Sequence, residues 1–340
     1  MIIKKENQLL KFIEYFFQSY LPQERGLSLH TIRSYRDTLK LFLQYLSKVK
    51  KYRGLQSVGL EEITAENVKN FLNWIEKLRN NSISTRNQRL AVIKTFVNFL
   101  TTQDIARGHQ LEKISLMTMK RVPYKPVVYL TDNEVHALLD SVDQNTNQGL
   151  RDYAILLMLY NSGARVQELC DLKIKDVRIE KPFMVTLVGK GQKTRQVPLW
   201  TGTIMAIKKY LEITSSSNPD HPIFIGKRGD PLSRFAVRYL VQVYVAKATE
   251  KCKSLKDKDI GPHTFRHTTA MHLLQSGVDI AVIKEWLGHA DLNTTHEYVE
   301  INMKMKEAAL AKTTSPKKNH KSISSILKQE KDVLKWLEAI

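Results

Sequence analysis

The spacing of apolar residues changes part-way along the chain, and this change constrains the fold more than any other feature. Over residues 1–106 the apolar side chains recur every three or four positions, as on one face of a helix. Residues 184–199 instead read MVTLVGKGQKTRQVPL, two short alternating runs around a Gly-Lys-Gly turn, which predict a hairpin. Helices are also predicted over residues 150–161, 233–247, 263–276 and 280–287 and from residue 294 onward, and a third short strand over residues 223–225.

Residues that cap helices support these elements. Ser28, Thr64 and Ser84 precede apolar-periodic runs, and Thr131 or Asp132 begins a helix after a proline-containing stretch. The predicted fold class is therefore an all-α N-terminal domain followed by a mainly α domain with a small antiparallel β-sheet. The predicted boundaries are residues 1–106 for the first domain, 107–128 for a linker, 129–312 for the second domain, and 313–340 for a C-terminal tail with an amphipathic helix.

Charge and composition narrow the class of partner. The chain has 340 residues, enough for two cores, and 53 Lys and Arg against 34 Asp and Glu give a net charge of +19. Such a surplus predicts a polyanionic partner, and nucleic acid is favoured over membrane headgroups. No apolar run approaches the roughly twenty residues of a membrane span, and the N-terminus does not read as a secretory signal. Two distant cysteines, Cys170 and Cys252, form neither a disulfide framework nor a zinc site, so a cytoplasmic location is expected.

Reactive side chains are concentrated in a few short segments. A site that cleaves a phosphodiester needs a nucleophile, positive groups for the nonbridging oxygens and an acid for the leaving oxygen. Taken singly, each candidate has a simpler role: a solvated arginine, a turn lysine, a histidine at a helix start or a core tyrosine. The segments are Gly-Ala-Arg165-Val-Gln-Glu168-Leu, Gly189-Lys190-Gly191, His263-Thr-Phe-Arg266-His267 and Leu287-Gly288-His289, followed by Tyr298.

Together these segments resemble the tyrosine recombinase (phage-integrase-like) family, in the order Arg, Lys, His-x-x-Arg, Gly-His, Tyr, with nine residues from His289 to Tyr298. The resemblance extends over residues 25–46, 84–100 and 129–312. It implies that Tyr298 attacks phosphorus to leave a 3′-phosphotyrosyl bond, while Lys190 is the general acid. It also implies that Arg165 and Arg266 clamp the phosphate, His263 assists proton transfer, His289 bonds a nonbridging oxygen and Glu168 braces the site.

The resemblance further implies the assembly and its requirements. Two double-stranded recombination sites would exchange strands in a homotetramer, with neither a metal nor another cofactor. His263 and His267 lie four residues apart, as in a zinc pair, but Thr264 replaces the glutamate of a zinc protease, so a structural role is favoured for His267. Two other functions share some of these features: a strand-nicking topoisomerase of the type IB kind, and a DNA-binding regulator with an inactive site.

Basic residues outside these segments are candidates for contacts with DNA phosphates, which position a protein without reading sequence. In the tail, apolar residues between 323 and 340 form one stripe, which we expect to dock on the neighbouring protomer rather than to fold back on its own domain. The composition also favours a role in moving a mobile element. The candidate DNA contacts are Arg33, Arg36, Arg86, Arg89, Lys94, Lys120, Arg121, Lys125, Lys193, Arg195, Lys227, Arg228, Arg234 and Arg238.

Overall fold

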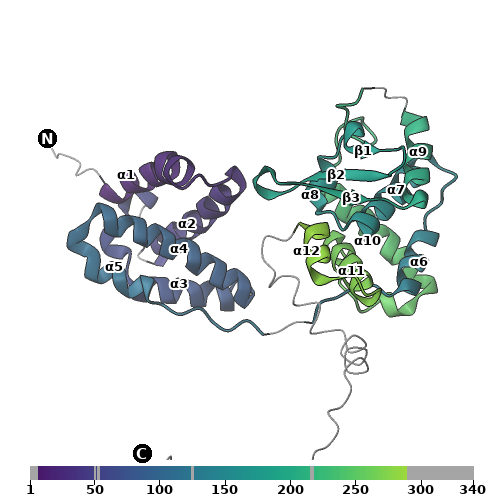
Figure 1. Ribbon diagram of the computed structural model, residues 1–340. Coiled ribbons are helices and arrows are strands. Elements are labelled where there is room, and N and C mark those ends of the chain that lie inside the picture. The colour runs from purple at the N-terminus through teal and green to yellow at the C-terminus, as the bar shows by residue number, and fades with distance from the viewer. Residues whose placement is uncertain (1–6, 50, 52–53, 124–125, 215–217, 289–340) are drawn as a thin grey trace, which may run out of the picture. The chain divides into compact units, whose positions relative to one another are not determined.

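The computed structural model divides the chain into two units, Met1–Lys125 and Pro126–Ile340 (Figure 1). The described part of the first unit is helical throughout. The second is mainly helical and contains one small antiparallel sheet, so the predicted fold class is confirmed. The structure describes residues 7–49, 51, 54–123, 126–214 and 218–288.

The first unit consists of helices whose starts are fixed by polar caps. The side chains of Asn7 and Thr64 accept hydrogen bonds from backbone N–H groups of the first turns of α1 and α3. Helix α4 begins two residues earlier than the sequence indicates, because Ser82 rather than Ser84 accepts the N–H of Thr85. The helices are α1 (Gln8–Tyr15), the π-helical η1 (Phe16–Glu24), α2 (Leu29–Val49), α3 (Ala65–Lys77), α4 (Ile83–Gln103) and α5 (Gly108–Ser115), with short 3-10 turns η2 (Leu55–Ser57), η3 (Leu60–Glu62) and η4 (Ile105–Arg107).

Aromatic side chains fill the core of this unit. Phe16, at the start of η1, is fully buried, and its ring centroid lies 5.0 Å from that of Phe96 and 5.1 Å from that of Phe99, both on α4. Phe42 of α2 and Phe71 of α3 form a second contact, with centroids 5.1 Å apart. These pairs join elements that are distant in sequence, so the four predicted helices form one core.

The beginning of the predicted linker contains a helix. Residues 107–128 were predicted to be a linker, but α5 lies within this stretch and packs on α3 and α4. Leu111 and Ile114, three residues apart, are buried in the core of the first unit. The side chain of Asn87 also exchanges two hydrogen bonds with the backbone of Lys120, at 2.7 and 3.1 Å. The first unit therefore extends beyond residue 106.

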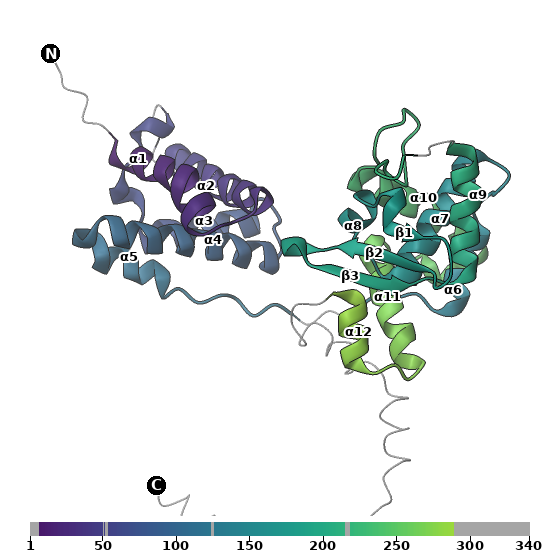
Figure 2. The ribbon, with the colours of Figure 1, turned by 45° about the horizontal axis from the view of Figure 1, so that its top comes forward.

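The second unit contains one three-stranded sheet of order β1-β2-β3, antiparallel throughout (Figure 2). Strands β2 and β3 form the predicted hairpin. The predicted strand at 223–225 is wrong: this segment makes only isolated bridges, in which Pro222 and Pro231 take part, and proline has no N–H to extend a ladder. The elements are α6 (Asp132–Asp140), α7 (Asn147–Ser162), α8 (Val166–Cys170), η5 (Ile174–Asp176), β1 (Val177–Arg178), β2 (Met184–Val188), η6 (Lys190–Gln192), β3 (Thr194–Pro198), α9 (Thr201–Thr214), α10 (Arg234–Lys251), η7 (Lys253–Leu255), α11 (Pro262–Gln275) and α12 (Ile280–Leu287).

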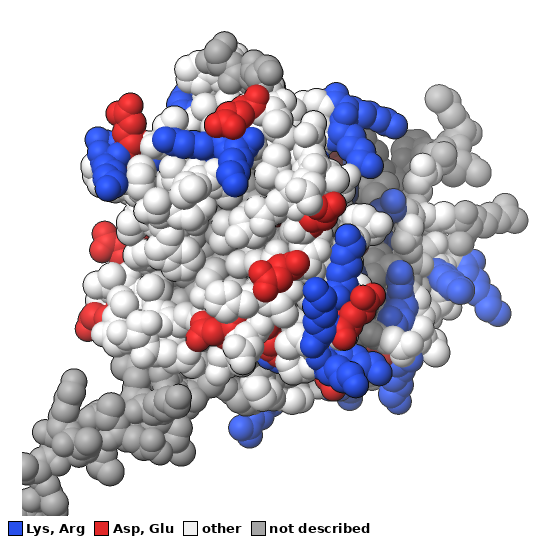
Figure 3. All heavy atoms as spheres, turned by 90° about the vertical axis from the view of Figure 1, so that its right-hand side faces the viewer, with Lys and Arg blue, Asp and Glu red and all other residues white. Residues whose placement is uncertain are grey.

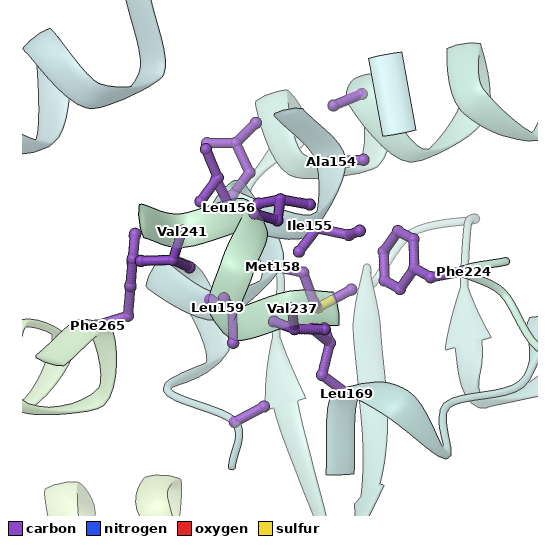
Figure 4. Packing of buried hydrophobic residues seen from close by; sticks show 14 of the residues in the cluster. Ala154, Ile155, Leu156, Met158, Leu159, Leu169, Phe224, Val237, Val241 and Phe265 are labelled. Atoms are coloured by element: carbon purple, nitrogen blue, oxygen red, sulfur yellow. The ribbon is translucent and has the colours of Figure 1, made fainter. Parts of the chain in front are cut away.

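Helix α7 lies at the centre of this unit. Residues 154–159 are buried without a break, so the helix is apolar on all sides and is covered by protein on all sides. Figure 4 shows Met158 and Leu159 of α7 among Val237 and Val241 of α10 and Phe265 of α11. The core therefore holds α11, which carries the His-x-x-Arg segment, against the helix that ends just before Arg165.

Some predicted features lie outside the described residues. These are His289, Tyr298, the helix expected from residue 294, the boundary at residue 312 and the amphipathic tail. Among the described helices, none combines the length and the apolar character needed to cross a membrane.

The position of α5 gives a test of the revised boundary. Leu111→Ala should lower the stability of the first unit by about 2–5 kcal/mol, because it leaves a cavity in a closed core. Leu116→Ala is the matched control, since Leu116 directly follows the same helix with 72 % of its surface exposed. Hydrogen exchange of peptides from α4 across a urea series measures both. Equal effects of the two variants would show that α5 is not part of the core.

Candidate functional site

Helix α12 ends in three consecutive carbonyl groups, and each accepts a hydrogen bond from a different arginine. The last carbonyls of a helix have no intrahelical partner and carry partial negative charge, so cationic donors stabilise them. The three arginines come from the residue before α8, from β3 and from α11, and they meet at this one helix end. The pairs are Arg195 Nε to Trp286 O at 2.9 Å, Arg266 Nη2 to Leu287 O at 2.6 Å and Arg165 Nη2 to Gly288 O at 3.1 Å.

The turn at Gly288 requires glycine for two reasons. Its φ of +64° lies in the left-handed region, which side chains with a Cβ rarely adopt. A Cβ would also lie 3.0 Å from Cδ of Arg195. The chain passes through this turn directly into His289, so the arginines fix the point from which the segment leading to Tyr298 begins.

Glu168 is the carboxylate that holds two of these arginines. Its side chain is 4 % exposed and lies in α8, three residues after Arg165. Arg165 donates to it through Nη1 and through its backbone N, both at 2.8 Å, and Arg195 donates through Nη1 and Nη2 at 2.9 and 2.7 Å. Burial alone would raise the pKa of Glu168, but the hydrogen bonds and charge of Arg195, and then of Arg165, hold it below its ordinary value. The carboxylate is therefore ionised at neutral pH.

Arg266 lies on α11 with a side chain buried within the second unit. Its Nη1 donates to the carbonyl of Gly163 at 2.8 Å, in the left-handed turn that separates α7 from Arg165. His263 lies one turn earlier on α11 and reaches solvent. Reduced hydration lowers the pKa of His263, and the positive charges of Arg266 and Arg165 lower it further. The two arginines therefore act on the charge of His263, and its neutral, proton-accepting form is favoured.

The hairpin brings the backbone of Lys190 to the same region. Gly189 donates its N–H to the carbonyl of Lys193 at 2.8 Å, and Gly191 has a φ of +75°, so the turn at the tip is tight. A Cβ on Gly189 would lie 3.2 Å from Oε1 of Glu168. The base of the turn thus lies against the carboxylate that holds Arg165. The structure brings Arg165, Glu168 and Arg266 together at the end of α12, with His263 one turn before Arg266 and the backbone of Gly189, next to Lys190, against Glu168.

Comparison with known proteins identifies the family. Residues 128–305 match the model of the phage integrase family, and residues 15–104 match the phage integrase N-terminal SAM-like domain. This chain belongs to the phage integrase family of tyrosine recombinases. It is 35 % identical over 310 residues to a putative integrase/recombinase y4rC of Sinorhizobium fredii, a match that covers 91 % of this chain and 93 % of the relative. It is 33 % identical over 290 residues to tyrosine recombinase XerC of Pelobacter propionicus, covering 84 % and 90 %.

Solved structures of other recombinases share the fold of this phage integrase family member. The XerH site-specific recombinase bound to difH DNA in a post-cleavage complex has a TM-score of 0.65 at 21 % identity, covering 91 % of this chain and 90 % of that one. The Tn1549 transposon integrase with circular intermediate DNA has a TM-score of 0.65 at 18 % identity, covering 87 % and 98 %. At these low sequence identities, the structural likeness shows that this chain shares the architecture of those proteins.

Two predicted DNA contacts of this recombinase are wrong, because their side chains are buried in salt bridges. Arg195 is 8 % exposed and bound to Glu168, and Arg86 is 8 % exposed with its Nε 3.3 Å from Oε2 of Glu76. Both errors follow from the face on which the residue lies. Arg195 is two positions before buried Val197 in a strand, and Arg86 is four before buried Leu90 in a helix.

The other predicted contacts stay predictions. Lys120 is bound to Glu76 at 2.8 Å and Arg36 to Asp37 at 2.8 Å, yet both side chains are about half exposed. Figure 3 shows one face of the second unit that is mostly uncharged, with Lys and Arg toward its edges, so the net charge is unevenly spread. Lys125 lies outside the described residues. The remaining candidates Arg33, Arg121, Lys193, Lys227, Arg228, Arg234 and Arg238 are exposed, and Arg89 and Lys94 are half-buried.

The sequence interpretation missed two aromatic residues on α10. Phe235 and Tyr239 are 79 % and 70 % exposed and lie beside Arg234 and Arg238. Their spacing of four places them on one helix face, away from buried Val237 and Val241. That spacing was the available signal. An arginine-rich aromatic face of this kind can contact both phosphates and bases.

The turn at Gly288 gives a stability test. Gly288→Ala should destabilise the second unit by roughly 1–2 kcal/mol, the cost of a left-handed residue with a Cβ, and the clash with Arg195 adds to it. Gly202→Ala is the control, because Gly202 lies in α9 with open space where its Cβ would be. Thermal unfolding of both variants measures the difference. If Gly288→Ala is as stable as Gly202→Ala, the end of α12 is not fixed as described.

Proposed function

We propose that this recombinase is a site-specific DNA strand transferase that acts through a 3′-phosphotyrosyl bond to Tyr298. The observation that carries the proposal is the meeting of Arg165 and Arg266 at the end of α12, with His263 one helical turn before Arg266 on α11. With Arg195, three guanidinium groups lie at this helix end, and Glu168, bound to Arg165 and Arg195, is the carboxylate between two of them, which leaves an excess of two positive charges. That excess suits a phosphodiester, whose nonbridging oxygens gain negative charge as the nucleophile attacks.

The proposed cleavage step is balanced in atoms and charge. The phenol oxygen of Tyr298 forms a bond to phosphorus as the bond from phosphorus to the 5′ oxygen breaks. The phenol proton passes to neutral His263, directly or through water, and Lys190 donates a proton to the departing 5′ oxygen. Rejoining reverses these steps with the 5′ hydroxyl of a partner strand. One phosphoester replaces another, so the exchange needs no external energy source.

For the biological setting, we propose movement of a mobile element, within the cytoplasm. The support is the likeness to a protein named integrase/recombinase and the shared fold of a transposon integrase. We further propose that four copies assemble on two DNA sites. Sequencing the DNA that flanks the gene tests the setting: recurrent junctions of one circular or inserted segment support it, and an invariant chromosomal site contradicts it.

A nicked duplex that traps the covalent product tests the chemistry. Wild-type protein should form an adduct on a 3′ end, and Tyr298→Phe should form none while it still binds the duplex. Tyr15→Phe is the matched control, because Tyr15 is an exposed tyrosine on α1, outside the predicted site and DNA contacts, and should leave the adduct intact. Denaturing gels measure the adduct. The enzyme function is excluded if wild type forms no adduct, or if Tyr298→Phe forms as much as wild type.

We propose that the C-terminal tail docks on the neighbouring protomer. A cavity of about 400 Å³ in the second unit offers an acceptor, since Tyr160, Trp200, Leu273 and Trp286 are among its lining residues. Nε1 of Trp286 is buried and has no hydrogen-bond partner among the described residues. A carbonyl of a docked segment would satisfy it, and the apolar stripe between residues 323 and 340 would cover the aromatic rings.

Deletion of residues 316–340 tests this docking. Assembly into tetramers on DNA should fall sharply, because each protomer loses its link to the next, while binding of one protomer to one half-site should persist. Native gels and light scattering separate the two species. Unchanged assembly with full recombination would rule the docking out. A loss of thermal stability in the DNA-free monomer would place the tail on its own domain instead.

A further inference from the structure

Arg195 is buried although it lies on a hairpin strand. Arg195 pairs with Leu187 of β2, which is fully buried. Val197, two residues after Arg195 in β3, is also fully buried. Strand alternation therefore directs Arg195 to the protein side of the sheet. Its side chain is 8 % exposed, and Nε, Nη1 and Nη2 all donate to acceptors within the second unit.

The two arginines bound to Glu168 differ in what they can reach. Arg195 holds the carboxylate with both guanidinium nitrogens, a planar fork that fixes orientation as well as charge. Arg165 uses Nη1 for the same carboxylate, and 34 % of its side chain is exposed. Arg195 thus balances the buried charge from inside, and Arg165 remains at the surface where a phosphate can approach.

Arg195 also joins the hairpin to the end of α12. Its Nε donates to Trp286 O at 2.9 Å, and a Cβ on Gly288 would lie 3.0 Å from its Cδ. Lys190 lies at the hairpin tip, five residues before Arg195 in the chain. One side chain therefore connects the segment that carries the proposed acid with the turn that leads to the proposed nucleophile.

We propose that Arg195 is a positioning residue of the recombination reaction: it fixes the Lys190 hairpin relative to the turn at Gly288 and does not contact DNA. This inference rests on the proposed function. Without Arg195, the hairpin loses the hydrogen bond from Nε to Trp286 O that links it to α12, and Glu168 is balanced by Arg165 alone. Lys190 would then be displaced from the departing oxygen, while the phosphate-binding surface remains.

Replacing the leaving oxygen by sulfur makes this displacement measurable. A thiol is far more acidic than an alcohol, so a thiolate leaves without a proton from Lys190. The experiment compares single-turnover adduct formation on two nicked duplexes, with oxygen or sulfur at the 5′ bridging position. The variants are Arg195→Gln, Arg195→Lys, and Lys190→Ala as the reference for a lost acid. Arg178→Gln is the control, because Arg178 lies exposed on β1 of the same sheet.

Arg195→Gln should cleave the oxygen substrate about 100-fold more slowly, as expected when a catalytic group is misplaced by about 1 Å. The sulfur substrate should recover most of this loss, as it should in Lys190→Ala, and the Kd for DNA should change less than about twofold. Arg195→Lys keeps the positive charge but lacks the planar pair of guanidinium nitrogens. Its loss of rate on the oxygen substrate, and the recovery on the sulfur substrate, should therefore be smaller but present. Arg178→Gln should match wild type on both substrates.

Two results would overturn the inference while the proposed function stands. Equal slowing on oxygen and sulfur substrates would mean that Arg195 does not act through the acid. Weakening of the Kd by the same factor as the rate would mean that Arg195 contacts DNA. If Arg195→Gln unfolds in a thermal scan, Arg195→Lys decides by the same two readouts. A wild-type chain that forms no adduct overturns the proposed function and this inference together.

Discussion

One buried carboxylate, shared between two arginines, is the interaction on which the rest of the site depends. An ionised Glu168 inside the second unit would be strongly destabilising if it were alone, because its hydration is lost. Arg165 and Arg195 remove that penalty, and in doing so they join the start of α8 to the hairpin. Both then donate to carbonyls at the end of α12, so three separate elements acquire one geometry.

This geometry is held by contacts within the second unit itself, which matters for catalysis. Charged groups that are already oriented need little rearrangement when negative charge develops on a phosphate. The core places them: α7 leads through the left-handed turn at Gly163 to Arg165, and the carbonyl of that glycine receives Arg266 from α11. The packing of α7, α10 and α11 thus decides where Arg165 and Arg266, the arginines proposed to bind the phosphate, can lie.

Much of the fold and of the site followed from the sequence, and the exceptions have physical reasons. Helices with long apolar stripes, such as α7, were predictable, and the catalytic residue types follow the family order. Arg195 and Arg86 were misjudged because their charge was weighed above the strand or helix face they share with Val197 and Leu90. Helix α5 was missed because its two buried residues are too few to give a periodic signal. No pattern in the chain could reveal that three arginines converge on consecutive carbonyls, since that depends on tertiary packing.

The burial of Arg195 and Arg266 separates two responses to ionic strength. Salt screens exposed charges strongly and buried ones weakly. Exposed basic residues such as Arg33 and Arg238 would therefore lose their attraction for DNA as salt is added, while the pairs around Glu168 keep their strength. We therefore expect a recombinase built in this way to release DNA at high salt with the arrangement around Glu168 intact, and to regain activity on dilution without refolding.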